Sequence, residues 1–217
     1  SDIKVAQLAG YVSEHAAYHH GEASLQSTIV NMAQSFVGSN NINLLVPSGQ
    51  FGTRLQGGKD SASPRYIYTR LSALTRFIFP ESDDTLLDYQ NEEGQSIEPT
   101  WYLPILPMVL VNGASGIGTG WSSEVPNYDP RAIVANIKHL LNGEEQDELL
   151  PWYKGFTGTI ERTPKVDSDV SYGELSKPNE TTLEISGLPI RRWTQDCKDL
   201  LEGMLQDTKE SPSSIKD

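Results

Sequence analysis

Residues 57–68 read Gly-Gly-Lys-Asp-Ser-Ala-Ser-Pro-Arg-Tyr-Ile-Tyr, a stretch that combines two glycines, two cations and two tyrosines with a helix-start signal. The pair Ser63-Pro64 suits the N-cap and first position of a helix, so the pattern predicts a helix over residues 64–78. Arg65 and Tyr66 would then lie in its first turn, where unpaired amides and the helix dipole favour an anion such as a phosphate or a phenolate. A tyrosine held beside an arginine there is a candidate nucleophile toward a phosphodiester. Simple packing of an amphipathic helix is the commoner alternative for such a pair.

The composition is that of an ordinary globular protein, with 37% hydrophobic and 21% charged residues in a chain of 217. This length suits one large domain or two modest ones with real cores. The sequence has no apolar run long enough to cross a membrane, and its first residues match neither a signal peptide nor a transit peptide. The single cysteine, Cys197, excludes a disulfide within the chain and is typical of a reducing compartment.

Charge is unevenly distributed along the chain, whose net charge is −12. Residues 1–78 hold six cations and four anions, a net charge of +2, together with three of the four histidines. Residues 79–217 hold the other 11 cations and 25 anions, a net charge of −14. The pattern indicates a mildly basic functional region followed by an acidic, solvated one. Because a charge of +2 is small for a DNA-binding domain, either the basic surface lies elsewhere or DNA is not the partner.

Two helices are predicted near the N-terminus. Apolar residues recur at helical spacing over residues 3–17 and again over 22–36, and a glycine-containing turn at 18–21 separates them. The pair resembles a helix-turn-helix, for which an ordinary helical hairpin is the commoner alternative.

A short strand and a glycine-rich hairpin are predicted next, at residues 43–46 and 47–58. A winged-helix domain has this order of elements, and its wing would carry Arg54 and Lys59. Residues 80–100 are rich in acidic and amide side chains and are expected to form an exposed acidic loop.

A second glycine-rich stretch, residues 112–122, has the look of a nucleotide-binding loop. It lacks the Gly-Lys-Ser/Thr ending of a P-loop, and no helix begins at its last glycines, so nucleotide binding is not expected. Ile117 stands between two glycines, where its side chain has little to pack against within the loop.

The remaining elements follow from caps and composition. Asp129-Pro130 opens a helix that Asn142-Gly143 closes, with Leu140 and Leu141 expected to face inward. Strands are predicted over 155–161 and 181–185, and a last helix from Thr194 with Leu200 facing inward. Asp167 and Asp169 have the spacing of a metal-binding pair, but their surroundings indicate a loop and no metal site is expected.

Several longer motifs occur in one order along the chain. They are Tyr18-His19-His20-Gly21-Glu22, Gln50-Phe51-Gly52-Thr53-Arg54, Gly57-Gly58-Lys59-Asp60, Pro64-Arg65-Tyr66-Ile67, and Val111-Asn112-Gly113-Ala114 leading into Gly116-Ile117-Gly118-Thr119-Gly120-Trp121. In this order they resemble eukaryotic DNA topoisomerase II, and the corresponding bacterial gyrase chain is similar more loosely. The resemblance covers nearly the whole chain and is weakest over 80–98 and 164–178.

The resemblance implies an α+β fold taken from the family's breakage–reunion core. Residues 1–97 would form most of a helix-turn-helix or winged-helix domain that bears the nucleophilic tyrosine, and residues 98–217 part of an α/β tower domain. The chain would then be a fragment that lacks the family's ATPase domain, Toprim domain and C-terminal dimer gate.

Site residues follow from the resemblance position by position. Tyr66 matches the tyrosine that attacks DNA, and Arg65 its neighbour at the scissile phosphate. Ile117 matches the isoleucine that wedges between base pairs. Five further residues match positions that line the cleavage site and are assigned as DNA contacts: His19, His20, Gln34, Arg54 and Lys59. Ser115 departs from the acidic residue frequent before the wedge, and only a local change is expected there.

The implied function is that of an isomerase, an ATP-dependent type II DNA topoisomerase. Such an enzyme cleaves both strands of a duplex through phosphotyrosyl links, passes a second duplex and religates. Mg²⁺ and ATP would serve the full-length enzyme at sites outside this chain, so the fragment alone would be inactive. Double-stranded DNA, a homodimeric full-length enzyme and a nuclear location are implied, with no membrane role. The alternative is a non-catalytic winged-helix module that binds and bends DNA.

Overall fold

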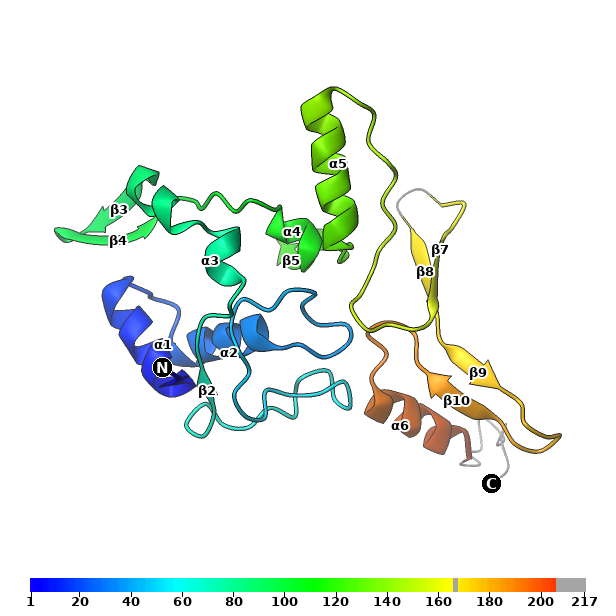
Figure 1. Cartoon of the computed structure of the whole chain (residues 1–217). Coiled ribbons are helices and arrows are strands. Elements are labelled where there is room, and N and C mark those ends of the chain that lie inside the picture. The colour runs from blue at the N-terminus through cyan, green and yellow to red at the C-terminus, as the bar shows by residue number, and fades with distance from the viewer. Residues whose placement is uncertain (166–167, 206–217) are drawn as a thin grey trace.

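The computed structural model describes residues 1–165 and 168–205, which form short helices and two-stranded sheets (Figure 1). Asp167 and the last twelve residues lie outside this range. The elements in chain order are β1 (Ile3–Lys4), α1 (Val5–His15), α2 (Glu22–Ala33), β2 (Tyr68–Thr69), α3 (Thr75–Ile78), the 3-10 helix η1 (Glu81–Leu86), β3 (Tyr89–Glu92), β4 (Gln95–Pro99), α4 (Met108–Val111), β5 (Ala114–Gly118), β6 (Trp121–Val125), α5 (Pro130–Asn142), β7 (Thr159–Arg162), β8 (Asp169–Tyr172), β9 (Glu174–Ser176), β10 (Glu184–Gly187) and α6 (Thr194–Leu205).

The main hydrophobic core lies in the N-terminal part, where α1 packs on α2. The two helices confirm the prediction over residues 3–36, although α2 ends at Ala33 because the backbone turns extended at Gln34. Apolar side chains from both helices and from the segments that follow them build the core: Val5, Ala9, Leu25, Ile29, Val30, Ala33, Leu45, Phe51 and Ile67.

A small antiparallel sheet replaces the helix that was predicted over residues 64–78. β2 pairs with β1 on one side, and on the other the segment 44–48 runs beside residues 68–72. The amides of Val46 and Ser48 donate to the carbonyls of Arg70 and Tyr68 at 2.8 and 3.1 Å. The predicted strand at 43–46 is therefore present as an extended, paired segment, whereas the predicted helix is wrong except for its last turn, α3.

The sequence around the failed helix shows why the strand forms instead. Residues 66–70 alternate between exposed and buried side chains, which is the period of a strand. The amide of Tyr68 donates to the carbonyl of Ser48 at 3.0 Å, so its partner is 20 residues away instead of four. Distant pairing has overridden the local Ser-Pro signal.

Residues 80–100 fold into η1 and the hairpin β3–β4, so the predicted acidic loop is wrong. Arg76 pairs with Asp84 at 2.7 Å, and the hydroxyl of Tyr89 donates to the Asp84 carbonyl at 2.7 Å. The pair Glu93-Gly94 turns the hairpin with positive φ at both residues, the geometry of a tight two-residue turn. In Figure 1 this hairpin projects away from the rest of the chain.

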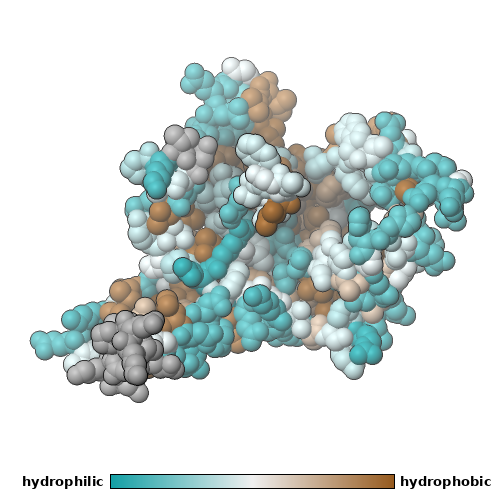
Figure 2. Space-filling view, turned by 180° about the vertical axis from the view of Figure 1, so that it is seen from behind, coloured by the Kyte–Doolittle hydropathy of each residue, from teal (hydrophilic) through white to brown (hydrophobic). Residues whose placement is uncertain are grey.

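The glycine-rich stretch at 112–122 also forms a hairpin, β5–β6, whose strands pair from Ala114↔Val125 to Gly118↔Trp121. Helix α5 begins and ends where predicted: the Asp129 carboxylate accepts from the Arg131 amide at 2.9 Å, and Gly143 ends it in the left-handed conformation. The prediction that Leu140 and Leu141 face inward is wrong, since both are exposed. The view from behind shows hydrophobic surface at the top of the molecule, where α5 lies (Figure 2).

The C-terminal part consists of the hairpin β7–β8, the hairpin β9–β10 and α6. The predicted strands exist but begin later than expected, at Thr159 and Glu184, and α6 begins at Thr194 as predicted. Leu200 is exposed, so its expected inward position is wrong. Among the described residues, none of the helices combines the length and apolar character that a membrane span requires.

Asparagines join the two halves of the chain. Asn41, which is buried, donates to the carbonyls of Tyr128 and Trp152 at 3.1 and 3.0 Å and accepts from the amide of Lys154 at 2.9 Å. Asn112 exchanges two hydrogen bonds with the backbone of Ile42, at 2.8 and 2.9 Å. Because these partners are backbone groups, the amides stabilise the junction by pairing polar atoms that burial would otherwise leave unsatisfied.

Candidate functional site

Arg65 and Tyr66 lie on a tight turn between the loop at 50–62 and β2. The turn is closed by the Tyr66 amide, which donates to the Ser63 carbonyl at 2.9 Å. No helix begins here, so the expectation that Arg65 and Tyr66 sit in the first turn of a helix is wrong, and with it the contribution of a helix dipole.

Helix α1 anchors this turn from the side. Its first amides, Val5 and Ala6, donate to the carbonyls of Ile67 and Pro64 at 3.0 and 3.1 Å. A helix leaves its first four amides without partners inside the helix, and here two of them hold the backbone on both sides of Tyr66. The buried Ile67 side chain fixes the turn to the core as well.

The side chains of Arg65 and Tyr66 project into solvent from this anchored backbone. Tyr66 is 73% exposed, and Arg65 is also exposed. Tyr68, two residues on, is 41% exposed with the Lys4 ammonium 5.9 Å from its ring centre. The turn therefore presents a phenol and a guanidinium to an outside ligand while the chain beneath them is held still.

The two predicted histidines lie on the turn between α1 and α2. Nε2 of His19 lies 3.0 Å from a carboxylate oxygen of Glu92 on β3, and both side chains are largely exposed. The ring of His20 meets Tyr18 edge to face with centres 5.5 Å apart. Pairing with Glu92 links the histidine turn to the β3–β4 hairpin, which the sequence did not indicate.

Arg54 and Lys59 belong to the loop at 50–62, which is closed on itself. Asp60 accepts from the amide of Thr53 at 2.9 Å and from its hydroxyl at 2.5 Å. The hydroxyl bond is the main reason why the pKa of Asp60 lies below its ordinary value of 3.8, against an opposing effect of burial. The carboxylate thereby holds the two ends of the loop tip together, with Lys59 exposed and Arg54 half-buried.

Gln34 supports this loop from below. It is 9% exposed, and its amide donates to the carbonyl of Phe51 at 3.0 Å. A Cβ on Gly58, where φ is +87°, would lie 2.4 Å from Nε2 of Gln34, so the loop rests directly on this side chain. The structure gives Gln34 a backbone partner, and its assignment as a DNA contact stays a prediction.

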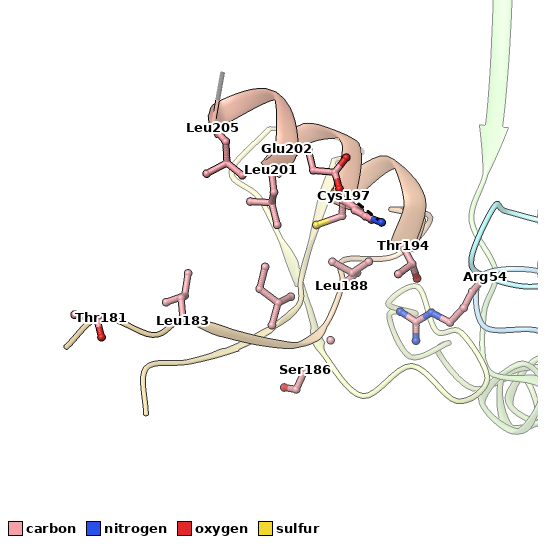
Figure 3. Close-up of a pocket in the computed structure, with 13 residues that line it drawn as sticks. Arg54, Thr181, Leu183, Ser186, Leu188, Thr194, Cys197, Leu201, Glu202 and Leu205 are labelled. Carbon is pink, nitrogen blue, oxygen red and sulfur yellow. Dashed lines mark ion pairs between the residues drawn. The ribbon is translucent and has the colours of Figure 1, made fainter. Parts of the chain in front are cut away.

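A cleft of about 400 Å³ separates α2 from the tyrosine turn. Its wall on α2 includes Ser27, Asn31 and Gln34, and its opposite wall is Gly58 with residues 61–64. The structure thus brings Gln34, the loop that carries Lys59 and the turn that carries Tyr66 around one opening. Arg54 instead faces a different groove, between β10 and α6 (Figure 3).

Ile117 lies elsewhere, near the tip of the β5–β6 hairpin. Its side chain is 91% exposed, which confirms the expectation of an apolar side chain without packing partners. Trp121, on the neighbouring strand, is 84% exposed and was not singled out from the sequence. Strand alternation directs these two side chains to opposite faces of the hairpin, because Ile117 pairs with Ser122 and Trp121 with Gly118.

The segment 191–195 was also missed, although it touches the predicted site. The Trp193 ring covers Gly57, and the amides of Thr194 and Gln195 donate to the carbonyls of Arg54 and Leu55 at 3.3 and 3.0 Å. The paired glycines at 57 and 58 were the available signal, since glycine pairs mark places where another group approaches the backbone closely.

Metal-ligating side chains are dispersed in the part of the chain that the structure describes. No group of three or more His, Cys, Asp or Glu residues there is placed to hold a metal ion. Asp169 lies 3.3 Å from Nε of Arg162, and its sequence partner Asp167 is outside the described residues.

Known proteins resemble the chain over its whole length. The DNA gyrase/topoisomerase IV family, in its A-chain branch, matches residues 1–217. DNA topoisomerase 2 of Pisum sativum is 63% identical over 203 residues, covering 94% of this chain and 14% of that protein. DNA topoisomerase 2-alpha of Homo sapiens is 58% identical over 217 residues, covering 100% of this chain and 14% of that protein.

A solved structure agrees with these sequence matches. The crystal structure of the Plasmodium falciparum topoisomerase II DNA-binding, cleavage and re-ligation domain superposes with a TM-score of 0.93 at 56% identity, covering 95% of this chain and 28% of that one. The chain thus spans about 14% of the length of the curated relatives that it matches. The chain belongs to the DNA gyrase/topoisomerase IV family, within which it is a piece of the eukaryotic DNA topoisomerase II breakage–reunion core.

Proposed function

We propose that the chain carries the nucleophile with which a type II DNA topoisomerase opens duplex DNA. The observation that carries the proposal is the Tyr66 turn: an exposed phenol beside an exposed guanidinium, on a backbone anchored by α1 and Ile67. A nucleophile must be accessible to a phosphodiester and still held in place, and this turn has both properties.

The proposed chemistry is a transesterification. Oη of Tyr66 attacks a DNA phosphorus, a bond from phosphorus to Oη forms, and the bond to the 3′ oxygen breaks. The proton of the phenol leaves as the phosphotyrosine forms, and the departing 3′ oxygen gains one. Because one phosphodiester replaces another, the step conserves energy and is reversible, which allows religation. Arg65 would stabilise the negative charge that builds up on the phosphate oxygens.

The fold assignment goes with this chemistry. Residues 1–97 would be most of a winged-helix domain, supported by a core confined to residues 5–67, the small sheet and the wing-like loop at 50–62. Residues 98–217 would be part of the tower domain, supported by the hairpins and α6. Lys59 and the exposed histidines would contact phosphates or bases around the cut.

Ile117 would act as a wedge in the bound duplex. Apolar side chains inserted between base steps unstack them and kink the duplex, at a cost that the added protein contacts repay. Its exposure at the tip of a narrow hairpin suits insertion into a groove. This observation also favours a second candidate, a module that bends DNA without cutting it.

The other parts of the reaction would come from outside the chain. The described residues do not fit a magnesium site, since they offer no cluster of three ligating side chains. Mg²⁺ would stabilise charge at the phosphates and ATP would drive strand passage, both bound by domains beyond these residues. We place the full-length enzyme in the nucleus as an ATP-dependent homodimer acting on double-stranded DNA.

A single substitution separates the two candidates. In the full-length enzyme with supercoiled DNA, Tyr66→Phe should abolish protein linked to DNA 5′ ends, because Phe lacks the attacking oxygen. Tyr68→Phe is the matched control, because it removes a nearby exposed hydroxyl, and should keep the link. Protein-linked 5′ ends with Tyr66→Phe would overturn the catalytic assignment and leave the bending module.

A further inference from the structure

The loop at 50–62 is held from two directions. On the N-terminal side, Gln34 supports Phe51 and Gly58, and the amide of Ala62 donates to the carbonyl of Gln50 at 2.9 Å. On the C-terminal side, the loop tip meets the segment that leads into α6. The part of the loop between its two closed ends depends on this second contact.

Trp193 makes that contact. A Cβ on Gly57 would lie 2.3 Å from Cε2 and Nε1 of Trp193, so the indole lies directly on the glycine backbone. The same ring meets Phe36 edge to face, with centres 5.8 Å apart and planes at 79°. Trp193 thus packs between Phe36, which follows α2, and the tip of the loop.

Backbone hydrogen bonds reinforce the contact. The amides of Thr194 and Gln195, at the start of α6, donate to the carbonyls of Arg54 and Leu55 at 3.3 and 3.0 Å. The first amides of a helix need partners outside it, and here the loop supplies two carbonyls. Loop and helix each satisfy polar groups of the other.

Arg191 fixes the direction from which Trp193 arrives. Its backbone has φ of +58°, unusual for a residue with a side chain. Its guanidinium lies 3.2 Å from Glu124, 3.3 Å from Oδ1 of Asn127 and 5.5 Å from the centre of the Tyr153 ring. These contacts tie the segment to β6 and to the residues that follow it.

Arg54 is the side chain that this arrangement affects most. Figure 3 shows it beside Thr194 at one end of the groove between β10 and α6. The Arg54 backbone is bonded to Thr194, so displacement of the Trp193 segment would release both its carbonyl and its side-chain surroundings.

We infer that Trp193 is a positioning residue for DNA cleavage: it fixes the loop tip so that Arg54 and Lys59 meet the phosphates near Tyr66. The inference rests on the proposed function and extends it to a residue of the C-terminal half. Trp193 lies outside the main core cluster, so its removal should loosen the loop and leave α1 and α2 packed.

The test compares Trp193→Ala with Trp193→Phe in the full-length enzyme, and Trp152→Ala is the control for removal of a half-buried tryptophan away from the loop. Hydrogen exchange without DNA should speed up at Gly58, Thr194 and Gln195 in Trp193→Ala, with α1 and α2 unchanged. At saturating DNA the covalent protein–DNA fraction should fall by roughly tenfold, the scale expected of a small misplacement. The salt slope of DNA binding should fall by about one for each phosphate that the loop no longer neutralises.

Trp193→Phe should restore most of both readouts, because a phenyl ring can still cover Gly57 and meet Phe36. Unchanged loop exchange in Trp193→Ala would overturn the inference, as would faster exchange with normal covalent product and salt slope. An equal decrease with Trp152→Ala would also overturn it, by showing a general effect of the C-terminal half. The proposed function fails separately, through Tyr66→Phe.

Discussion

Single residues in this chain are placed by partners that are distant in sequence. The Tyr66 turn is held by amides of α1, and the loop tip by Trp193. Local sequence could identify Arg65 and Tyr66 as a chemically interesting pair and Ile117 as an unpacked side chain. It could not reveal the anchors, because their positions depend on the folded chain.

Gly58 provides a test at the scale of one residue. Gly58→Ala should destabilise the protein by about 1–3 kcal/mol, because its φ of +87° is strained for alanine and the new Cβ would meet Gln34 at 2.4 Å. The control is Gly10→Ala in α1, which has open space around it and should be stabilising by about 0.5–1 kcal/mol. Urea unfolding measures both, and equal effects would contradict the close approach.

Asp60 provides a pH dependence at the same scale. Its pKa is lowered in the folded state, so its contribution to stability is present above the unfolded value near 3.8 and is lost as pH falls through the folded value. The difference in unfolding free energy between the native protein and Asp60→Asn should therefore be constant at neutral pH and shrink below pH 3.8. A difference that does not change with pH would show that the Thr53 bonds do not depend on charge.

At the scale of elements, the sequence was informative where local signals decide the structure. Helices α1, α2, α5 and α6 follow from apolar periodicity and, at α5, from clear caps. The helix predicted over 64–78 failed because Ser63-Pro64 also suits a turn and the next residues pair with segments far away in the chain. The β3–β4 and β5–β6 hairpins were missed because charge and glycine hid their pairing.

The β5–β6 hairpin carries a prediction of its own. Ile117→Ala should lower the DNA bend, measured by energy transfer between dyes at the ends of a duplex, because wedges of this kind kink DNA by about 20–90°. Ser122→Ala changes the residue directly opposite Ile117 and should leave the bend as it is. An unchanged bend with Ile117→Ala would exclude the wedge.

At the scale of the whole molecule, the two halves are joined through buried asparagines. Asn41→Ala would leave the Lys154 amide and the carbonyls of Tyr128 and Trp152 without their side-chain partner. Each unsatisfied buried group costs about 1–3 kcal/mol, so the junction should loosen before the N-terminal core unfolds. Calorimetry should then show a separate early transition.

Asn43→Ala is the control for the junction, since Asn43 donates only to the nearby carbonyl of Leu45 at 2.7 Å. It should keep the transition of the native protein. A single transition for Asn41→Ala, shifted no further than for Asn43→Ala, would show that the halves do not depend on this amide.

The Trp193 contact also orders events during protein synthesis. A ribosome releases Gly57 and Tyr66 long before it adds Trp193, so the nascent chain has its nucleophile while the neighbouring loop has only one of its two supports. Contacts between distant residues form late in folding because loop closure must come first. If Trp193 positions the loop, a chain still being made carries a cutting residue that it cannot yet use, and an abandoned one is harmless to DNA.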